Sequence, residues 1–302
     1  MGELGFIGLG RMGNNMVMRL LEDNHKVTVF DQNPGKVKEL VSKGAAGSES
    51  IKELVSKLSK PRIIWVMVPS GEPVKEVLNE LKELLDKDDI VIDGGNSNFH
   101  ETMSRAAKLK EIGVTMMDAG TSGGLSGADK GYCMMVGGDR EAYDEIEPII
   151  KSLCMTDGYA YISGSGSGHY VKMIHNAIEY GMMQSIAEGF DLLANGRFKD
   201  LDLEKISRLW NHGSIISSFL LRMAEKAFTN DPELESLKPY VDDSGEGRWA
   251  VKEAVEQRVP FMVNTQALYS RFASRDDNSM ANRLLAAIRR EFGGHSVKKK
   301  KE

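Results

Sequence analysis

A glycine-rich motif near the N-terminus constrains the fold of this chain more than any other feature. Gly8, Gly10 and Gly13 form the sequence GLGRMG, which follows the apolar run Leu4–Leu9 and opens the amphipathic segment Met12–Glu22. A strand, a tight glycine turn and a helix in this order are typical of the start of a dinucleotide-binding βαβ unit. The first glycine permits the turn, the second lets the backbone approach a pyrophosphate, and the third lets helix and strand pack closely.

The residues around this turn are the expected nucleotide contacts, because the N–H groups and the partial positive charge of a helix N-terminus attract phosphates. The predicted contacts are Gly8, Gly10, Arg11, Met12 and Gly13, together with Val68 at the end of a later apolar run. A glycine turn that binds no ligand is the alternative interpretation.

Asp31 bears on which nucleotide binds. It follows the apolar run Val27–Phe30, about twenty residues beyond the glycines, where an acid hydrogen-bonds the adenosine ribose hydroxyls. A carboxylate there repels the 2′-phosphate of NADP, and none of the next three residues is an arginine. The sequence therefore predicts NAD. Asp31 as a simple cap of the turn is the competing interpretation, and Arg11 keeps NADP open as the less favoured cofactor.

The pattern of the first half indicates an α/β fold. Short β-rich runs alternate with amphipathic segments, which predicts a Rossmann-type, doubly wound and mostly parallel sheet. The predicted strands are Leu4–Leu9, Val27–Phe30, Ile63–Val68, Ile90–Asp93, Thr115–Asp118 and Tyr132–Val136. The predicted helices between them are Met12–Glu22, Lys36–Lys43, Pro73–Leu85, Thr102–Ile112 and Glu141–Ser152.

The pattern changes at Ser163–Gly168 (SGSGSG), after which strand signals nearly vanish and helical periodicity takes over. We expect a dinucleotide-binding domain over residues 1–165, followed over residues 166–302 by an all-helical substrate and dimerisation domain with a C-terminal tail. Its predicted helices are His169–Asn195, Asp202–Asn211, Ile215–Phe228, Arg248–Gln257, Phe261–Ser274 and Asn278–Phe292. The first is long for a globular helix, so we expect it to join the two domains.

Polar side chains follow one face of that long helix. Lys172, His175, Asn176 and Glu179 are spaced i, i+3, i+4 and i+7 among mostly apolar neighbours, and a polar strip on an apolar helix needs water, a partner or a substrate. Oxidation of a secondary alcohol needs a base for the hydroxyl proton, and a lysine can serve where burial lowers its pKa. An internal salt-bridge network that pairs Lys172 with Glu179 is the alternative.

Composition argues against several other classes of protein. The net charge of −5 and the pI near 5.8 argue against a nucleic-acid binder. No apolar run reaches the length of about 18 residues that a membrane span requires. Cys133 and Cys154 are the only cysteines, too few for a disulfide framework or a metal site built on cysteine pairs. We therefore expect a cytoplasmic protein.

Further motifs carry a resemblance to a known family. They are the opening GLGRMG, Asp93–Ser97 (DGGNS), Asp118–Gly131 (DAGTSGGLSGADKG), Gly168–Gln184 and Arg289–His295 (RREFGGH). Over almost its whole length the chain resembles the short form of the 6-phosphogluconate dehydrogenases, within the β-hydroxyacid dehydrogenase superfamily. That superfamily shares the glycines, a Ser-Gly-Gly and the lysine, but not Lys-x-x-His-Asn with Ile-Glu-Tyr-Gly.

The resemblance implies the oxidative decarboxylation of 6-phosphogluconate to ribulose 5-phosphate and CO2, in the pentose phosphate pathway and gluconate utilization. Lys172 would take the proton of the C3 hydroxyl as hydride leaves for the nicotinamide, and would return a proton to the carbonyl oxygen as CO2 leaves. Glu179 would protonate C1 of the resulting enediol. No metal is needed, because a β-keto acid decarboxylates when a proton donor stabilises the enolate.

The resemblance also implies the substrate contacts and the oligomeric state. Asn96 would bridge substrate and cofactor, and a tail carrying Arg289 and His295 would complete the site of a neighbouring subunit, in a homodimer or homotetramer. The other implied contacts are Ser122, Gly123 and Gly124 for the carboxylate and nearby hydroxyls, His175 and Asn176 for sugar hydroxyls, and Tyr180 and Arg271 for the phosphate.

One stretch departs from the family pattern. Longer members carry Lys-Gly-Thr-Gly-Lys-Trp, whose first lysine contacts the phosphate, whereas this chain has DSGEGRW at Asp243–Trp249 and lacks that lysine. Arg248 aligns with the second lysine. A β-hydroxyacid dehydrogenase for a non-phosphorylated acid, such as gluconate or 3-hydroxyisobutyrate, therefore stays open. A dinucleotide-binding sensor without turnover is the alternative from another class, and the Lys172 and Glu179 pair argues against it.

Overall fold

The computed structural model describes residues 2–293, 296 and 298. The chain forms two compact units, one ending at Asn176 and the other beginning at Ala177. The boundary between them lies inside the long helix α8 (Ser167–Asn195), which therefore contributes residues to both units.

In the described part of the first unit, eight strands form one sheet in the order β3-β2-β1-β4-β5-β6-β7-β8. Neighbouring strands are parallel except for β6 and β7, which confirms the predicted Rossmann-type, mostly parallel sheet. The strands are β1 (Glu3–Ile7), β2 (Lys26–Phe30), β3 (Ala46–Gly47), β4 (Ile63–Val66), β5 (Ile90–Asp93), β6 (Thr115–Ser122), β7 (Tyr132–Gly137) and β8 (Cys154–Tyr161).

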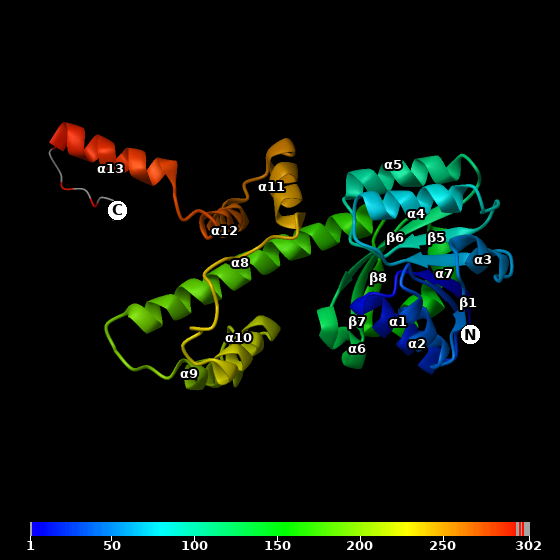
Figure 1. The fold of residues 1–302 in the computed structure, drawn as a ribbon, viewed down its shortest axis with the longest axis horizontal. Helices are drawn as coiled ribbons and strands as arrows, with labels where there is room; N and C mark the ends of the chain where they lie inside the picture. The colour runs from blue at the N-terminus through cyan, green and yellow to red at the C-terminus, as the bar shows by residue number, and fades with distance from the viewer. Residues whose placement is uncertain (1, 294–295, 297, 299–302) are drawn as a thin grey trace. The chain divides into compact units, whose positions relative to one another are not determined.

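Helices cover both faces of this sheet, as Figure 1 shows for α4 and α5 on one face and for α1 and α2 on the other. One apolar core joins α1, α2 and α7 to the sheet through residues such as Met16, Leu40 and Ile146. The other core joins α3, α4 and α5 through Leu54 and Leu78, among others. The helices of this unit are α1 (Arg11–Glu22), α2 (Pro34–Val41), α3 (Ile51–Ser56), α4 (Glu72–Lys82), α5 (Phe99–Lys110), η1 (Gly124–Ser126, 3₁₀), α6 (Gly127–Lys130) and α7 (Arg140–Leu153).

The sequence prediction missed the elements that lack a strong apolar pattern. Strand β3 has two residues, and β8 lies at the edge of the sheet with mostly exposed or half-buried side chains. Helices α3 and α6 are a few residues long. Strand β6 runs four residues beyond its predicted end at Asp118, because Ala119–Ser122 pairs antiparallel with β7.

The described residues of the second unit form helices joined by loops and no strand, as predicted. Its helices after α8 are α9 (Leu203–Asn211), α10 (Phe219–Asn230), α11 (Glu246–Glu256), α12 (Met262–Ala273) and α13 (Met280–Gly293). Helix α10 begins later than predicted because the Ser218 side chain caps it, accepting the N–H of Leu221. No described helix is both long and apolar enough to cross a bilayer.

Candidate active site

The glycine turn has the shape that a pyrophosphate requires. Gly8 has φ +98°, and a Cβ atom there would collide with the Met67 carbonyl. A Cβ atom on Gly13 would collide with the Gly8 carbonyl, so α1 and β1 pack closely only because both residues are glycine. A Cβ atom on Gly10 would meet no protein atom within 4 Å. This open space lies at the N-cap of α1, where no side chain caps the helix.

These features fit the phosphates of a dinucleotide. Strands β2 and β3 lie on one side of β1, and the chain then crosses to β4 on the other side, so the strand order reverses between β1 and β4. Ligands of such sheets bind beyond the carboxyl ends of the strands at the point of reversal. Of the other predicted contacts, Arg11 is exposed and Val68 lies beside Gly8. The Met12 side chain packs against the core, so only its backbone faces the turn.

Asp31 lies directly after β2 and is held by several donors. Its carboxylate accepts the Leu9 N–H at 2.7 Å and the Asn33 N–H at 2.9 Å, and it pairs with Lys36 Nζ at 3.2 Å. Burial alone would raise the pKa of Asp31, but the backbone N–H donors and Lys36 outweigh it and lower the pKa below its ordinary value. The carboxylate is therefore charged, and it both caps its own turn and ties that turn to the glycine loop.

A second group of polar side chains gathers at the C-terminal end of β6. Lys172 is only 5% exposed, and its Nζ donates to Asn176 Oδ1 at 2.7 Å and lies 3.4 Å from His175 Nδ1. His175 Nε2 lies 3.2 Å from Ser122 Oγ. The structure thus brings together four residues of the predicted site, and burial keeps water away from the amine that is predicted to exchange protons.

Gly120 of strand β6 and Asn96, which bonds to that strand, adjoin this cluster. A Cβ atom on Gly120 would lie 2.6 Å from the Cβ of Lys172, so the strand must be bare where α8 crosses it. Asn96 has φ +52°, and its amide group accepts the Thr121 N–H at 2.9 Å and donates to the Thr121 carbonyl at 3.2 Å. Asn96 therefore adjoins β6 one residue before Ser122. Gly123 and Gly124 continue the chain with positive φ values.

The start of α8 is fixed by a residue that sequence analysis left without a role. Asp118 is fully buried, and its carboxylate accepts the N–H groups of Gly166 at 2.7 Å and His169 at 2.9 Å. The His169 ring contacts Thr102 Oγ1 at 2.8 Å and the Asp93 carbonyl at 3.1 Å. Asp118 stands within the quoted motif DAGTSGG, but its partners are distant in the sequence, so no local pattern could identify them.

The second unit holds the remaining predicted residues. Tyr180 is buried, and its hydroxyl accepts the Ser244 N–H at 3.0 Å. The Arg271 guanidinium lies 3.6 Å from the centre of the Tyr180 ring, which brings the two predicted phosphate contacts together. Glu179 is half-buried on α8, and Arg289 is exposed on α13. His295 lies outside the described residues.

The stretch that departs from the family pattern is built around Asp243. Its carboxylate pairs at 2.8 Å with both Arg248 and Arg275, and it accepts the Gly245 N–H at 3.2 Å. Burial would raise the pKa of Asp243, but the two arginines outweigh it and lower the pKa to about 2. Sequence analysis missed Arg275, which directly follows the predicted helix Phe261–Ser274 and lies far from Asp243 in the sequence.

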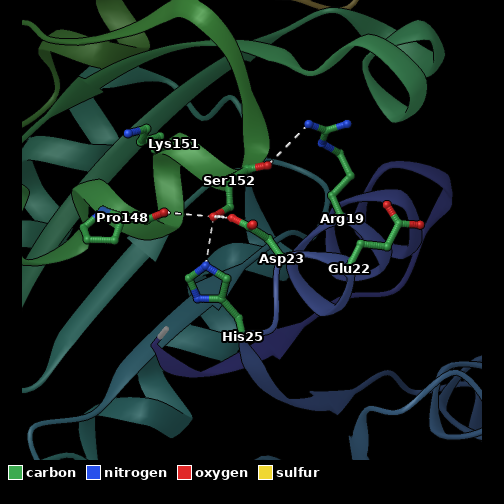
Figure 2. Close-up of a pocket in the computed structure, with 7 residues that line it drawn as sticks. All are labelled: Arg19, Glu22, Asp23, His25, Pro148, Lys151 and Ser152. Atoms are coloured by element: carbon green, nitrogen blue, oxygen red, sulfur yellow. Dashed lines mark hydrogen bonds between the residues drawn. The ribbon is translucent and has the colours of Figure 1, made fainter.

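A cavity of about 650 Å³ elsewhere on the first unit is lined by Asp23, His25 and Ser152, the residue types of a serine-hydrolase triad. In Figure 2, Ser152 lies between His25 and Asp23. His25 Nδ1 accepts the Gly2 N–H, so Nε2 carries the proton and faces Ser152 Oγ at 2.9 Å, while that hydroxyl donates to Asp23. The imidazole therefore cannot take the proton of Ser152, which an activated serine nucleophile requires.

Comparisons with known proteins agree with the fold and the motifs. Residues 3–162 match the NAD binding domain of 6-phosphogluconate dehydrogenase, and residues 168–302 match the C-terminal domain of the same enzyme. The chain belongs to the 6-phosphogluconate dehydrogenase family. It is therefore an oxidoreductase with an NAD(P)-binding domain, as the resemblance implied.

Two relatives and one solved structure illustrate this membership. The chain is 45% identical to YqeC of Bacillus subtilis, over 99% of this chain and 100% of that protein. It is 43% identical to the NAD(+)-dependent, decarboxylating 6-phosphogluconate dehydrogenase of Haloferax volcanii, over 99% of each chain. The Plasmodium falciparum 6-phosphogluconate dehydrogenase, solved with NADP+ and with 6-phosphogluconate, superposes with a TM-score of 0.83 at 28% identity, over 99% of this chain and 67% of that one.

Proposed function

We propose that this protein is a cytoplasmic 6-phosphogluconate dehydrogenase that prefers NAD and releases ribulose 5-phosphate and CO2 in the pentose phosphate pathway. The observation that carries the proposal is the buried Lys172 amine, which lies among Asn176, His175 and Ser122 in the unit that holds the glycine turn. The NAD(+)-dependent relative from Haloferax volcanii supports the choice of nucleotide. We assign nucleotide binding to residues 1–165 and most substrate contacts to residues 166–302.

Each residue has a role in this proposal. The bound nicotinamide supplies the acceptor for the hydride of C3. Lys172 Nζ takes the proton of the C3 hydroxyl, which leaves a 3-keto acid whose C1–C2 bond is weakened. As that bond breaks and C1 departs as CO2, Lys172 returns the proton to the C3 oxygen, which gives the enediol. Glu179 then protonates the carbon that was C2 of the substrate and becomes C1 of the product. The return of the first proton regenerates the base. The enediol hydroxyl on the former C3 loses its proton to water as the ketone forms, and a proton from water restores the acid form of Glu179, so no net proton is consumed.

We also assign the residues that contact the substrate. Ser122, Gly123 and Gly124 bind the carboxylate, because their turn presents a hydroxyl and backbone N–H groups. Asn96 orients substrate and nucleotide, and His175 and Asn176 bind hydroxyls. Tyr180 and Arg271 bind the phosphate. A guanidinium stacked on a ring keeps its N–H groups in its own plane, where they can donate to phosphate oxygens. Arg289 and His295 act on the site of a neighbouring subunit in a homodimer or homotetramer.

A second candidate is an oxidoreductase of the same family that acts on a non-phosphorylated acid. The observation that favours it is the pairing of the Asp243 carboxylate with both Arg248 and Arg275. Asp243 begins the stretch in which longer relatives carry lysines. Two cations that pair with an internal acid attract a phosphate less strongly than two unpaired cations.

One set of initial rates tests both candidates. Purified enzyme is supplied with 6-phosphogluconate, gluconate or 3-hydroxyisobutyrate, with NAD or NADP, and both the reduced nucleotide and CO2 are measured. We expect the highest kcat/KM for 6-phosphogluconate with NAD, with one CO2 for each nucleotide reduced. A higher kcat/KM for gluconate would favour the second candidate. Nucleotide binding without reduction of any of these acids would instead support a sensor and reject both.

A further inference from the structure

Lys36 lies against the residue on which the nucleotide preference rests. It is the third residue of α2, and its Nζ lies 3.2 Å and 3.3 Å from the two carboxylate oxygens of Asp31. The Asp31 side chain is 12% exposed, whereas that of Lys36 is 40% exposed. The ion pair therefore joins a carboxylate inside the turn to an ammonium group that reaches it from solvent.

The two partners differ in how firmly they are held. The Asp31 carboxylate is fixed by the backbone N–H groups of Leu9 and Asn33, so it keeps its position whether or not Lys36 is present. Lys36 reaches it through a flexible four-carbon stem. A half-exposed ion pair of this kind contributes only about 0–1 kcal/mol, so the ammonium can exchange one anion for another at little cost.

The pair gives this position two kinds of charge. Asp31 offers an acceptor to the ribose hydroxyls of NAD, but it repels a 2′-phosphate, which carries a charge of about −1.5 to −2. Lys36 is a cation within hydrogen-bond distance of the same carboxylate. An ammonium group is a compact point charge that binds phosphate without a fixed geometry. This part of the site can thus bind NAD through Asp31 and the 2′-phosphate of NADP through Lys36.

We propose that Lys36 is a specificity-determining residue, whose ammonium leaves Asp31 for the 2′-phosphate of NADP and gives the enzyme its secondary use of that nucleotide. The inference rests on the proposed preference for NAD at Asp31. It differs from the interpretation in which Arg11 serves the 2′-phosphate, because Lys36 is the cation that already pairs with the discriminating carboxylate.

Binding of two nucleotide fragments tests this without any turnover. AMP carries a free 2′-hydroxyl and adenosine 2′,5′-bisphosphate carries the phosphate, and calorimetry gives Kd for each with the full-length protein. We expect Lys36→Met to weaken the bisphosphate about tenfold, the scale of one charge-assisted hydrogen bond, and to leave AMP within about twofold. Lys38→Met on the same helix is the matched control, because Lys38 is exposed; it should change neither Kd.

A double-mutant cycle separates Lys36 from general electrostatics. Asp31→Asn removes the charge and keeps an acceptor for the Leu9 N–H, so it should tighten the bisphosphate. Most of that gain should vanish in Asp31→Asn combined with Lys36→Met. Equal weakening of both fragments by Lys36→Met would mean that the lysine only supports the turn, and no weakening would mean that another cation serves the phosphate; either result overturns the proposal.

The fragments also separate this inference from the proposed function. If the bisphosphate loses affinity selectively but 6-phosphogluconate is not oxidised, the role of Lys36 stands and the substrate assignment fails. If the unmodified protein binds neither fragment at millimolar concentration, the proposed nucleotide site and the role of Lys36 are both wrong.

Discussion

Gly120 of β6 lies directly beneath Lys172 of α8, so close that a Cβ atom on the glycine would come within 2.6 Å of the lysine Cβ. The same atom would lie 2.5 Å from the Gly168 carbonyl, in the first turn of the helix. A backbone atom cannot yield to this overlap as a flexible side chain can. The distance between strand and helix, and with it the position of the Lys172 amine, is therefore set by the absence of one methyl group.

Replacing that glycine tests the position of the base. Gly120→Ala should displace the first turn of α8 and lower kcat by about 100-fold, because a misplacement of about 1 Å at a reacting group costs that much. Nucleotide affinity should stay close to that of the unmodified enzyme, since the glycine turn follows β1, which is separated from β6 by β4 and β5 in the sheet. Gly189→Ala is the control on the same helix, where a Cβ atom meets nothing within 4 Å. A kcat unchanged by Gly120→Ala would contradict the argument.

Lys172→Met should remove the base while preserving the fold, since methionine fills a similar volume in the buried position. We expect reduction of the nucleotide to fall by about 10²- to 10⁴-fold, the usual contribution of a general base. Absorbance of the reduced nucleotide measures the rate, and fluorescence titration measures nucleotide affinity, which should not change. If Lys172→Met reduced the nucleotide at the normal rate, the assignment of the base would be wrong.

Two replacements of Asp31 should differ because the carboxylate has two tasks. Asp31→Asn keeps an acceptor for the Leu9 N–H and removes the charge, so the preference of kcat/KM for NAD over NADP should narrow by about tenfold, as expected for one charged contact. Asp31→Ala should also narrow the preference, but with weaker binding of both nucleotides because the glycine loop loses its anchor. A higher kcat/KM with NADP in the unmodified enzyme would overturn the predicted preference.

His25 should make the first unit less stable in mild acid. Burial lowers the pKa of His25 below its ordinary value of 6.5, although the neighbouring Asp23 acts in the opposite direction. The unfolded chain then binds more protons than the folded one, so stability is lost as the pH falls below 6.5. His25→Gln should flatten this dependence, which thermal unfolding at several pH values would reveal. An equal loss of Tm on acidification in both proteins would assign the effect to other groups.

Asp243 should stabilise the second unit above the pH at which it is protonated. Because Arg248 and Arg275 lower its pKa from 3.8 to about 2, the stabilisation is complete above 3.8 and is lost as the pH falls through about 2. Asp243→Asn should cost about 1–3 kcal/mol at neutral pH, since it leaves two cations without their partner. Urea unfolding measures this, and the difference between the two proteins should shrink toward pH 2.

The parts of the fold that sequence could predict are those with their own periodicity. Strand β5 (Ile90–Asp93) is a buried, mostly apolar run and has the predicted bounds, whereas β1, β2, β4 and β7 differ from their predicted bounds by one or two residues at one or both ends. Strand β8 was missed because an edge strand with exposed side chains has no apolar pattern to reveal it. The bound of β6 was wrong for a related reason: Gly120 lowers the propensity of a segment that is a strand only because β7 pairs with it.

The contacts of the candidate site were also predictable only where they follow a local periodicity. Helical spacing alone predicted that Lys172, His175, Asn176 and Glu179 share one face of the helix, and the first three of these contact one another. Ser122 was placed beside them only by resemblance to a family. The ion pair of Asp31 with Lys36 could not be predicted, because it depends on how tightly a turn closes.

The anchoring of α8 by Asp118 has a consequence for how this chain tolerates insertions and deletions. The buried carboxylate fixes the N–H groups of Gly166 and His169, and each helical residue advances about 100° around the axis. A residue inserted between His169 and Lys172 would therefore rotate the lysine away from Ser122 by more than a quarter turn, while the anchor held. A residue inserted before Gly166 would cause no such rotation, because the two anchored N–H groups both follow the insertion. The rotational position of Lys172 about the helix axis is thus set from Gly166 onward, and a change of length earlier in the Ser/Gly segment does not alter it.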